Sequence, residues 1–460
     1  MPVEELPRPS VSLRSRQWTV GTLIYGIGEL AVLFFWLLWG DFAWNLKERA
    51  VGSVVQLLLK KFGASDAVVA LLIGALPQAI SILWGPIIGS LSDRHRGRWG
   101  RRLPFLLVPT PFAVAAMFGL AFSPEIGRHL HLIFGKSLPD PNAATVIVIG
   151  LLWGFFEVTV TIINAVFAAL INDVVPHAVI GRFFGLFRAV SLIAGILFFF
   201  SAIGKAEAYY KVIFIGLGLL YGIGFTSMCL MVKEGEYPPP PPHVGHGLVA
   251  HFAAIWSFFR ECFGQPYYLW VFASISLGWV AFTPTNLFNL FFAKSVDMSV
   301  DAYGKYIALT FVCSLILAYP LGILADRFHP LRMGLVTIAL YVLVTLWGGL
   351  FATTTGTFAI ALVAHGIVSG AWMTSTAAIG QMLLPKPKFG QFASAMNVVT
   401  ALGTMIVGPL VGELLDHTGN VYRDAYLASS GLAFLGLLAG IVLYRQFLRL
   451  GGPHYYVAPE

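Results

Sequence analysis

The chain has 460 residues, of which 57% are hydrophobic and 11% are charged, and its mean hydropathy is +0.79. Since a soluble globular protein carries about 25% charged residues, this composition excludes a water-soluble fold and predicts an integral membrane protein. The net charge of +7 does not indicate a nucleic-acid partner, because the basic residues are spread between apolar runs and form no single patch.

Twelve apolar segments are long enough to span a bilayer, which takes about 20 mainly apolar residues. In chain order they cover residues 18–40, 67–91, 104–122, 144–171, 183–202, 211–232, 267–292, 303–324, 333–352, 357–384, 391–414 and 424–446. The sequence therefore predicts an all-α integral membrane protein with twelve transmembrane helices, six on each side of a proline-rich stretch.

These segments divide the chain into five parts. We expect a cytoplasmic tail (1–17), a six-helix bundle (18–232), a cytoplasmic linker (233–266), a second six-helix bundle (267–447) and a cytoplasmic tail (448–460). The linker contains five consecutive prolines, Pro238 to Pro242, which cannot form a membrane helix because proline lacks the backbone donor. Residues 247–262 are typical of an amphipathic helix lying on the membrane surface.

The distribution of Lys and Arg sets the orientation. With the N-terminus inside, 18 of the 29 basic residues fall on the cytoplasmic side and 11 on the other, so both termini are expected to be cytoplasmic. The first external loop opposes this trend, because it carries Lys47, Arg49, Lys60 and Lys61. The N-terminus does not resemble a cleaved signal peptide, so we predict a multi-pass protein of the cell membrane (plasma or bacterial inner membrane).

The two halves repeat a polar signature. The segment from Trp84 to Arg98 recurs from Ala318 to Arg332, and Asp93 and Asp326 lie 233 positions apart. Parallel six-helix repeats with substrate bound between them are one of the standard transporter plans. Asp93 is a lone acid among arginines, so we expect it to form a specific contact that holds the cytoplasmic side shut.

These residues carry a resemblance to a known family. The run from Gly89 to Arg102, GSLSDRHRGRWGRR, resembles the signature between helices 2 and 3 of the major facilitator superfamily, and GTMIVGPLVG (403–412) resembles its helix-packing motif. LIYGIGEL in helix 1 and LGWVAFTPTNLFNLFFAKSVDMSV in helix 7 are similar to the sugar:cation symporters, including the sucrose-transporter-like branch. The resemblance implies the major facilitator fold and a gating role for Gly89, Asp93, Arg94, Arg98, Arg101, Arg102, Gly322, Asp326, Arg327 and Arg332.

Polar residues inside membrane helices are costly and usually face a cavity or a partner. They recur at helical spacing in spans 1, 4, 7 and 10, whereas spans 3, 6, 9 and 12 hold no Asp, Glu, His, Asn or Gln in their cores. The stripes predict one shared cavity; their alternative is hydrogen bonding between packed helices. The candidate substrate-binding residues are Tyr25, Thr161, Asn164, Trp279, Thr283, Asn286, Ser369, Trp372 and Thr376.

Three titratable residues are candidates for ion coupling. Glu29 and Glu157 lie within predicted spans, and a buried carboxylate there needs a proton or a cationic partner. His365 is either a neutral core histidine or a proton-linked cavity group. Arg188 is expected to reach the cytoplasm as a structural residue; the alternative is a pair with a cavity carboxylate or the substrate.

The sequence therefore predicts a secondary active transporter for a small polar solute, a sugar or glycoside, coupled to proton or sodium. No G-x-x-x-x-G-K-[S/T] motif occurs, and no catalytic or metal-ligand cluster stands out, so we expect neither an ATP-driven pump nor an enzyme, and no cofactor or metal. The alternatives are a facilitator-type exporter of an amphipathic compound and a transporter-like receptor without flux. The expected partners are the solute and the lipid bilayer, with the protein a monomer.

Overall fold

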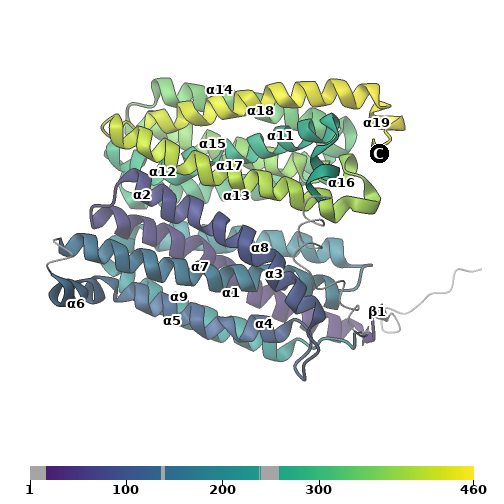
Figure 1. The fold of residues 1–460 in the computed structure, drawn as a ribbon, viewed down its shortest axis with the longest axis horizontal. Coiled ribbons are helices and arrows are strands. Elements are labelled where there is room, and N and C mark those ends of the chain that lie inside the picture. Colours follow the sequence, from purple (N-terminus) through teal and green to yellow (C-terminus); the bar gives the residue numbers. More distant parts are fainter. Residues whose placement is uncertain (1–16, 136–139, 238, 240–257, 460) are drawn as a thin grey trace, which may run out of the picture.

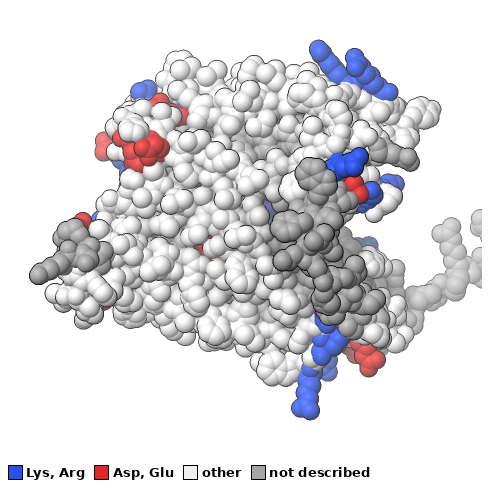
Figure 2. Space-filling model, viewed as in Figure 1, with Lys and Arg blue, Asp and Glu red and all other residues white. Residues whose placement is uncertain are grey.

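The fold is seen in a computed structural model that describes residues 17–135, 140–237, 239 and 258–459. Among these residues, twelve helices are long and apolar enough to cross a membrane. They form two bundles that lie side by side, with the N-terminal bundle below and the C-terminal bundle above in Figure 1. The predicted helical membrane fold is confirmed, and charged side chains gather at the two ends of the molecule with an almost uncharged belt between them (Figure 2).

The N-terminal bundle begins with a short hairpin. Its elements are β1 (Trp18–Val20), β2 (Leu23–Tyr25), α1 (Ile27–Lys61), α2 (Asp66–Val69), the π-helical turn η2 (Ala70–Ala75), α3 (Leu76–Arg94), α4 (Leu103–Leu107), α5 (Pro109–Ala121), α6 (Ser123–Phe134), α7 (Pro141–Val174), α8 (Ile180–Ser201), the 3-10 turn η3 (Ile203–Lys205) and α9 (Ala206–Met231). Within this bundle α1 packs on α8 and α9, and α7 packs on α3 and α5.

The C-terminal bundle follows the linker. Its elements are α11 (Pro266–Val280), α12 (Thr283–Ser295), α13 (Val300–Phe328), α14 (Pro330–Phe351), α15 (Thr355–Thr376), α16 (Ile379–Leu383), the 3-10 turn η4 (Lys386–Lys388), α17 (Phe389–His417), α18 (Arg423–Arg449) and α19 (Gly452–Tyr455). Here α14 packs on α15 and α18, and α11 packs on α17 and α18. The predicted surface helix of the linker lies mostly outside the described residues.

The first membrane helix differs from its prediction. Residues 18–25 form the antiparallel hairpin, turned at Gly21 with φ of +54°, and α1 then continues to Lys61. The expected end at residue 40 is wrong, because the polar segment that begins at Asp41 is helical, with Asp41 and Lys47 buried, where a loop was predicted. Lys47 and Arg49 therefore lie within a membrane span, and the external loop that opposed the charge asymmetry is reduced to residues 62–65, next to Lys60 and Lys61 at the end of α1.

The two bundles meet at one end of the membrane span. We call the end that carries Asp93, Glu234 and α19 the signature face, and the end that carries Asp66, α6 and Asp416 the opposite face. Towards the opposite face, α17 packs on α2 and η2, and α13 packs on α8 and η3. In contrast, Gly89 and Gly322 near the signature face have open space where a Cβ would lie. The bundles are thus joined at the opposite face and part towards the signature face.

Candidate functional site

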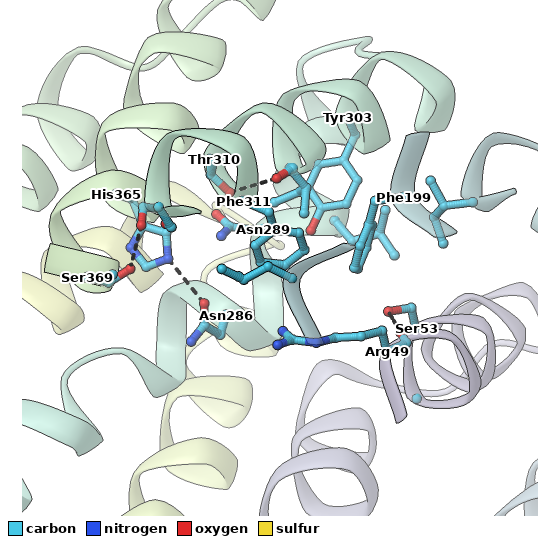
Figure 3. A pocket seen from close by; sticks show the side chains of 18 of the residues that line it. Arg49, Ser53, Phe199, Asn286, Asn289, Tyr303, Thr310, Phe311, His365 and Ser369 are labelled. Carbon is cyan, nitrogen blue, oxygen red and sulfur yellow. Dashed lines mark hydrogen bonds between the residues drawn. The ribbon is translucent and has the colours of Figure 1, made fainter. Parts of the chain in front are cut away.

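A cavity of about 470 Å³ lies between the two bundles (Figure 3). Its walls come from α1 and α8 of the N-terminal bundle and from α12, α13 and α15 of the C-terminal bundle. The polar lining residues of the first bundle are Glu48, Arg49, Ser53, Gln56 and Arg188. Those of the second are Asn286, Asn289, Tyr303, Thr310, Ser314, His365 and Ser369. Such a mixture of apolar wall and few placed polar groups is typical of small-molecule sites.

The polar groups on the C-terminal side are held by a network behind them. His365 Nε2 lies 3.1 Å from Asn286 Oδ1, and its Nδ1 lies 3.0 Å from the buried Tyr341 hydroxyl. Tyr426 donates a hydrogen bond to Asn289 Oδ1 at 2.8 Å. Since buried polar networks with all members satisfied are rigid, these residues present a preformed surface to the cavity.

Arg49 crosses the cavity from α1. Figure 3 shows its guanidinium extended towards Asn286 of the other bundle, and it lies 5.0 Å from the Phe311 ring centroid. Arg49, Ser53 and Gln56 follow an i, i+4, i+7 spacing, so one face of α1 lines the cavity. Gln56 also donates a hydrogen bond from Nε2 to the backbone carbonyl of Leu287, which joins the bundles directly.

Behind this wall lie Lys47, Glu48 and Glu157, which we call the buried charge cluster because Lys47 and Glu157 are buried; the Glu48 side chain is 47% exposed. Lys47 is fully buried, its Nζ lies 2.8 Å from Glu48 Oε2, and it also lies 3.5 Å from the Trp44 ring centroid. Glu157 of α7 is 8% exposed and interacts electrostatically with both Lys47 and Glu48. Because Glu48 also lines the cavity, the cluster and the cavity share one carboxylate.

The opposite face is closed by a contact between the bundles. The Asp416 carboxylate of α17 accepts hydrogen bonds from the backbone N–H groups of Asp66 and Ala67, at 2.8 and 2.9 Å, and so caps the N-terminus of α2. Lys60 Nζ lies 2.6 Å from Asp66 Oδ1, and Gly412 lies against the Asp66–Ala67 backbone. A carboxylate at a helix N-terminus is stabilised by the free N–H groups and the helix dipole.

We expect Asp416→Ala to favour opening at the opposite face. Loss of such a cap costs about 1–2 kcal/mol, which shifts the open-to-closed ratio by about 5- to 30-fold. The measurement is labelling of a cysteine placed at Ser53 by a membrane-impermeant maleimide applied from the opposite face. Glu413→Gln is the control, since Glu413 lies one turn earlier on α17 and pairs only with His417 among the described residues. Equal labelling of both variants would mean that the cap does not hold this face.

The signature face carries the predicted motif as a charge network. Arg102, which is 6% exposed, lies 2.6 Å from Asp93 and 3.0 Å from Asp173 at the end of α7, and it donates to Ser92 at 2.8 Å. Burial opposes the charged form of Arg102, but Asp173 and Asp93 outweigh it and raise the pKa of the guanidinium. Arg101 also pairs with Asp173 at 2.9 Å. All of these contacts lie within the N-terminal bundle.

The linker is tied to the same network. Glu234 accepts hydrogen bonds from the backbone N–H groups of Arg101, Arg102 and Leu103, at 2.9, 2.8 and 2.7 Å, and caps α4. Tyr237 donates to Asp173 Oδ2 at 3.3 Å. The linker thereby fixes the loop between the second and third membrane helices.

The repeated signature in the C-terminal half is different. Within the part of the chain that the structure describes, Asp326 forms no ion pair, and Arg332 donates from Nε to the Tyr444 hydroxyl at 2.6 Å. Arg327 lies against the neighbouring Phe328 ring. The repeat has no counterparts of Arg101 and Arg102, which explains why Asp326 lacks the partners that Asp93 has.

Replacing Arg102 by Gln is expected to lower the free energy of unfolding by about 1–2 kcal/mol, because Asp93 loses its close charged donor and Asp173 keeps only Arg101. The measurement is the melting temperature of the purified protein in detergent. Arg98→Gln, on the exposed part of the same loop, is the matched control and should melt like the wild type. Equal melting of both variants would contradict a structural role for the network.

Of the predicted site residues, the structure brings Asn286, His365 and Ser369 to the cavity. Trp372 does not line it: it is 4% exposed and packs against Gly278 and Trp279 in the core of its own bundle. Thr376 bonds to the Trp372 carbonyl. The remaining candidates Thr161, Asn164, Trp279 and Thr283 also lie outside the lining.

Glu29 lies at the end of α1 and not within an apolar span. Its carboxylate is exposed and accepts the Gly26 N–H at 2.8 Å, so it caps the helix. Tyr25 is in β2, and burial together with the negative charge of Glu29 raises the pKa of Tyr25 to about 12. The prediction that these two residues share a buried helix face is wrong, because the helix begins two residues after Tyr25.

The polar lining residues missed by sequence reasoning are Glu48, Arg49, Ser53, Gln56, Asn289, Tyr303, Thr310 and Ser314. Helix 4, predicted as a cavity wall, contributes no residue to the lining of this cavity, whereas α8 and α13 do. A weak signal for Arg49 was present in the sequence: residues 50–59 are mainly apolar and contain no proline, so the helix can continue past the charged segment.

Comparisons with known proteins agree with this geometry. Residues 24–444 match the family described as MFS/sugar transport protein. The MFS-type transporter YfkF of Bacillus subtilis (strain 168) is 27% identical over 220 residues, and mouse solute carrier family 45 member 3 is 28% identical over 121 residues. These matches span 42% and 26% of this chain, and about half and a fifth of the relatives.

Solved structures share the fold at low sequence identity. An inward-facing, unoccupied bacterial homologue of the human lysosomal transporter Spinster aligns with a TM-score of 0.62 at 16% identity, covering 94% of this chain and 98% of that one. The D-xylose-proton symporter aligns with a TM-score of 0.63 at 14% identity over 90% and 97% of the chains. A point mutant of the nucleoside transporter NupG gives 0.64 at 12% identity over 90% and 100%.

Proposed function

Since the chain belongs to the MFS/sugar transport protein family of membrane transporters, we propose that it carries a small polar solute, a sugar or glycoside, by secondary active transport. The family and the twelve apolar helices make it an integral multi-pass membrane protein, and the family consists of transporters, not enzymes. The observation that carries the proposal is the polar cavity lined by both bundles and closed at the opposite face. Parting of the bundles at alternate faces exposes such a cavity to each side in turn.

The signature face is the cytoplasmic one in this proposal. With Lys47 and Arg49 inside a membrane helix, the external count of basic residues falls from 11 to 9, against 18 on the side of the termini. The excess of basic residues on the side of the termini, which orients membrane proteins, is therefore larger than the sequence alone indicated. Both termini are then cytoplasmic, and the cavity opens inward. We place the protein in the cell membrane as a monomer.

The coupling ion acts at the buried charge cluster. Glu157 is enclosed in the N-terminal bundle, and its neighbours Lys47 and Glu48 give the cluster one positive and two negative groups. Binding of a proton or a sodium ion offsets the charge of Glu157, whereas release of the ion leaves this buried carboxylate to share Lys47 with Glu48, which is costly. Because Glu48 lines the cavity, a change in the charge of the cluster changes the electrostatic potential at the solute site.

The test is uptake of labelled sugars into proteoliposomes under an imposed proton gradient and, separately, a sodium gradient. The proposal expects accumulation above equilibrium with one of the two gradients, and no accumulation when an ionophore dissipates it. Movement that only equalises the two sides indicates a facilitator, and binding without movement indicates a receptor. Either result would overturn the proposal of coupled transport.

A further inference from the structure

Two arginines of the N-terminal bundle face the same cavity. Arg49 comes from α1 and Arg188 from α8, and each repels the other electrostatically. Among the described residues, neither guanidinium lies within 4.0 Å of a carboxylate oxygen. Arg188, predicted as a structural residue that reaches the cytoplasm, lines the cavity instead.

The one acidic group in the described lining, Glu48, attracts Arg49 and offsets only part of this charge. Glu48 is already engaged by Lys47 at 2.8 Å, on the side of the buried charge cluster. On the other wall of the cavity, Asn286, Asn289 and Ser369 are uncharged. The cavity therefore presents two positive charges and one carboxylate that Lys47 already pairs with, which leaves an excess of positive charge.

Like charges at membrane depth are costly, so an intramembrane pair of this kind indicates a ligand that neutralises it. A guanidinium is a planar fork of donors that matches the two oxygens of a carboxylate or the oxygens of a phosphate. We infer that the transported solute carries a negative charge, and that Arg49 and Arg188 bind its anionic group. This rests on the proposed function, since it specifies the solute of that same cavity.

The rest of the lining fits the neutral part of such a solute. Asn286, Asn289 and Ser369 offer donors and acceptors for hydroxyl groups, while the rings of Phe199 and Phe311, 5.8 Å apart, offer an apolar face. Arg49 reaches towards Asn286, so an anionic group held by the arginines places its hydroxyls against the C-terminal wall (Figure 3). A solute bound in this way touches both bundles, as alternating access requires.

The experiment compares D-glucuronate, D-glucose 6-phosphate and D-glucose on the purified full-length protein, by ligand-dependent shifts in melting temperature. We expect at least one of the two anions to bind at least tenfold more tightly than D-glucose. Arg49→Gln and Arg188→Gln should each remove that preference, and Arg49→Lys should retain part of it. Arg182→Gln is the matched control, because Arg182 lies on the same helix as Arg188 but is exposed outside the cavity.

The results show whether the anionic group is a carboxylate or a phosphate. They also distinguish failure of this inference from failure of the proposed function on which it rests. Preference for D-glucuronate identifies a carboxylate, and preference for D-glucose 6-phosphate a phosphate ester. D-glucose bound as tightly as both anions, or an anion preference that survives in both Gln variants, overturns the inference while leaving sugar transport intact. If no sugar, charged or neutral, binds or enters proteoliposomes, the proposed function fails and the inference fails with it.

Discussion

Lys47→Met is expected to lower the free energy of unfolding by about 2–3 kcal/mol, because it removes the ion-pair partner of the half-exposed Glu48 and the positive charge nearest to the buried Glu157. Lys47 has no exposed surface, and it is enclosed by Glu48 and the rings of Trp44, Phe156 and Tyr221. Methionine keeps most of the side-chain volume, so loss of the charge dominates the effect. The measurement is the melting temperature in detergent, together with the yield of folded protein.

A second substitution tests whether the loss of stability in Lys47→Met comes from charge or from packing. Removal of the unpaired carboxylate in Lys47→Met/Glu48→Gln should recover part of the lost stability, whereas the unrelated pair Lys47→Met/Glu413→Gln should not. Glu413 is exposed near the end of α17 and remote from the cluster. If Glu48→Gln gives no recovery, the cost of Lys47→Met comes from packing and not from an unpaired charge.

Glu157→Gln is expected to abolish accumulation against a gradient while leaving solute exchange measurable. The amide cannot release and rebind a proton, nor can it hold sodium as a carboxylate does, so the coupling step is lost while the cavity itself is unchanged. Exchange is the internal control, because it needs the cavity and the movement of the bundles but no net ion transfer. The measurement is the steady-state ratio of internal to external solute in proteoliposomes.

Glu29→Gln provides the matched comparison. Its carboxylate is exposed at the start of α1 and bonds only to the Gly26 N–H among the described residues, so this variant should accumulate solute like the wild type. Loss of accumulation in Glu29→Gln but not in Glu157→Gln would reverse the assignment and identify Glu29, at the start of α1, as the coupling residue.

Most of the fold follows from the sequence because a lipid-spanning helix is defined by length and apolar content, which are properties of one segment alone. Eleven of the twelve predicted spans match the helices, with ends that differ by up to eight residues. The exception is the first span, which was predicted to end at residue 40 but extends to Lys61. Residues 41–49 hold five polar or charged side chains, and their summed hydropathy is that of a loop.

What keeps that segment in the membrane is partners from elsewhere in the chain. Asn45 donates to Asp41 at 2.6 Å and accepts from Ser191 of α8 at 2.7 Å, and Lys47 lies among aromatic rings from α7 and α9. A hydropathy sum counts each polar group as if it faced lipid, so it cannot anticipate a segment whose polar groups satisfy one another across helices.

The candidate site was predicted in part for a related reason. Asn286, His365 and Ser369 were found because polar residues at helical spacing mark one face of a helix, but that spacing does not say whether the face meets a cavity or a neighbour. The indole ring of Trp372 packs against Gly278, where an added Cβ would collide with it. This contact between two helices of the same bundle cannot be read from the spacing of residues along one helix.

In the proposed mechanism, the inter-bundle cavity and the buried charge cluster together perform coupled transport. Its most direct test is the accumulation ratio, in proteoliposomes with an imposed proton or sodium gradient, of the sugar that most stabilises the purified protein. We predict a ratio well above one for the wild type, a ratio of one for Glu157→Gln, and exchange retained in both. A wild-type ratio of one under both gradients, or a Glu157→Gln ratio equal to that of the wild type, would contradict this account.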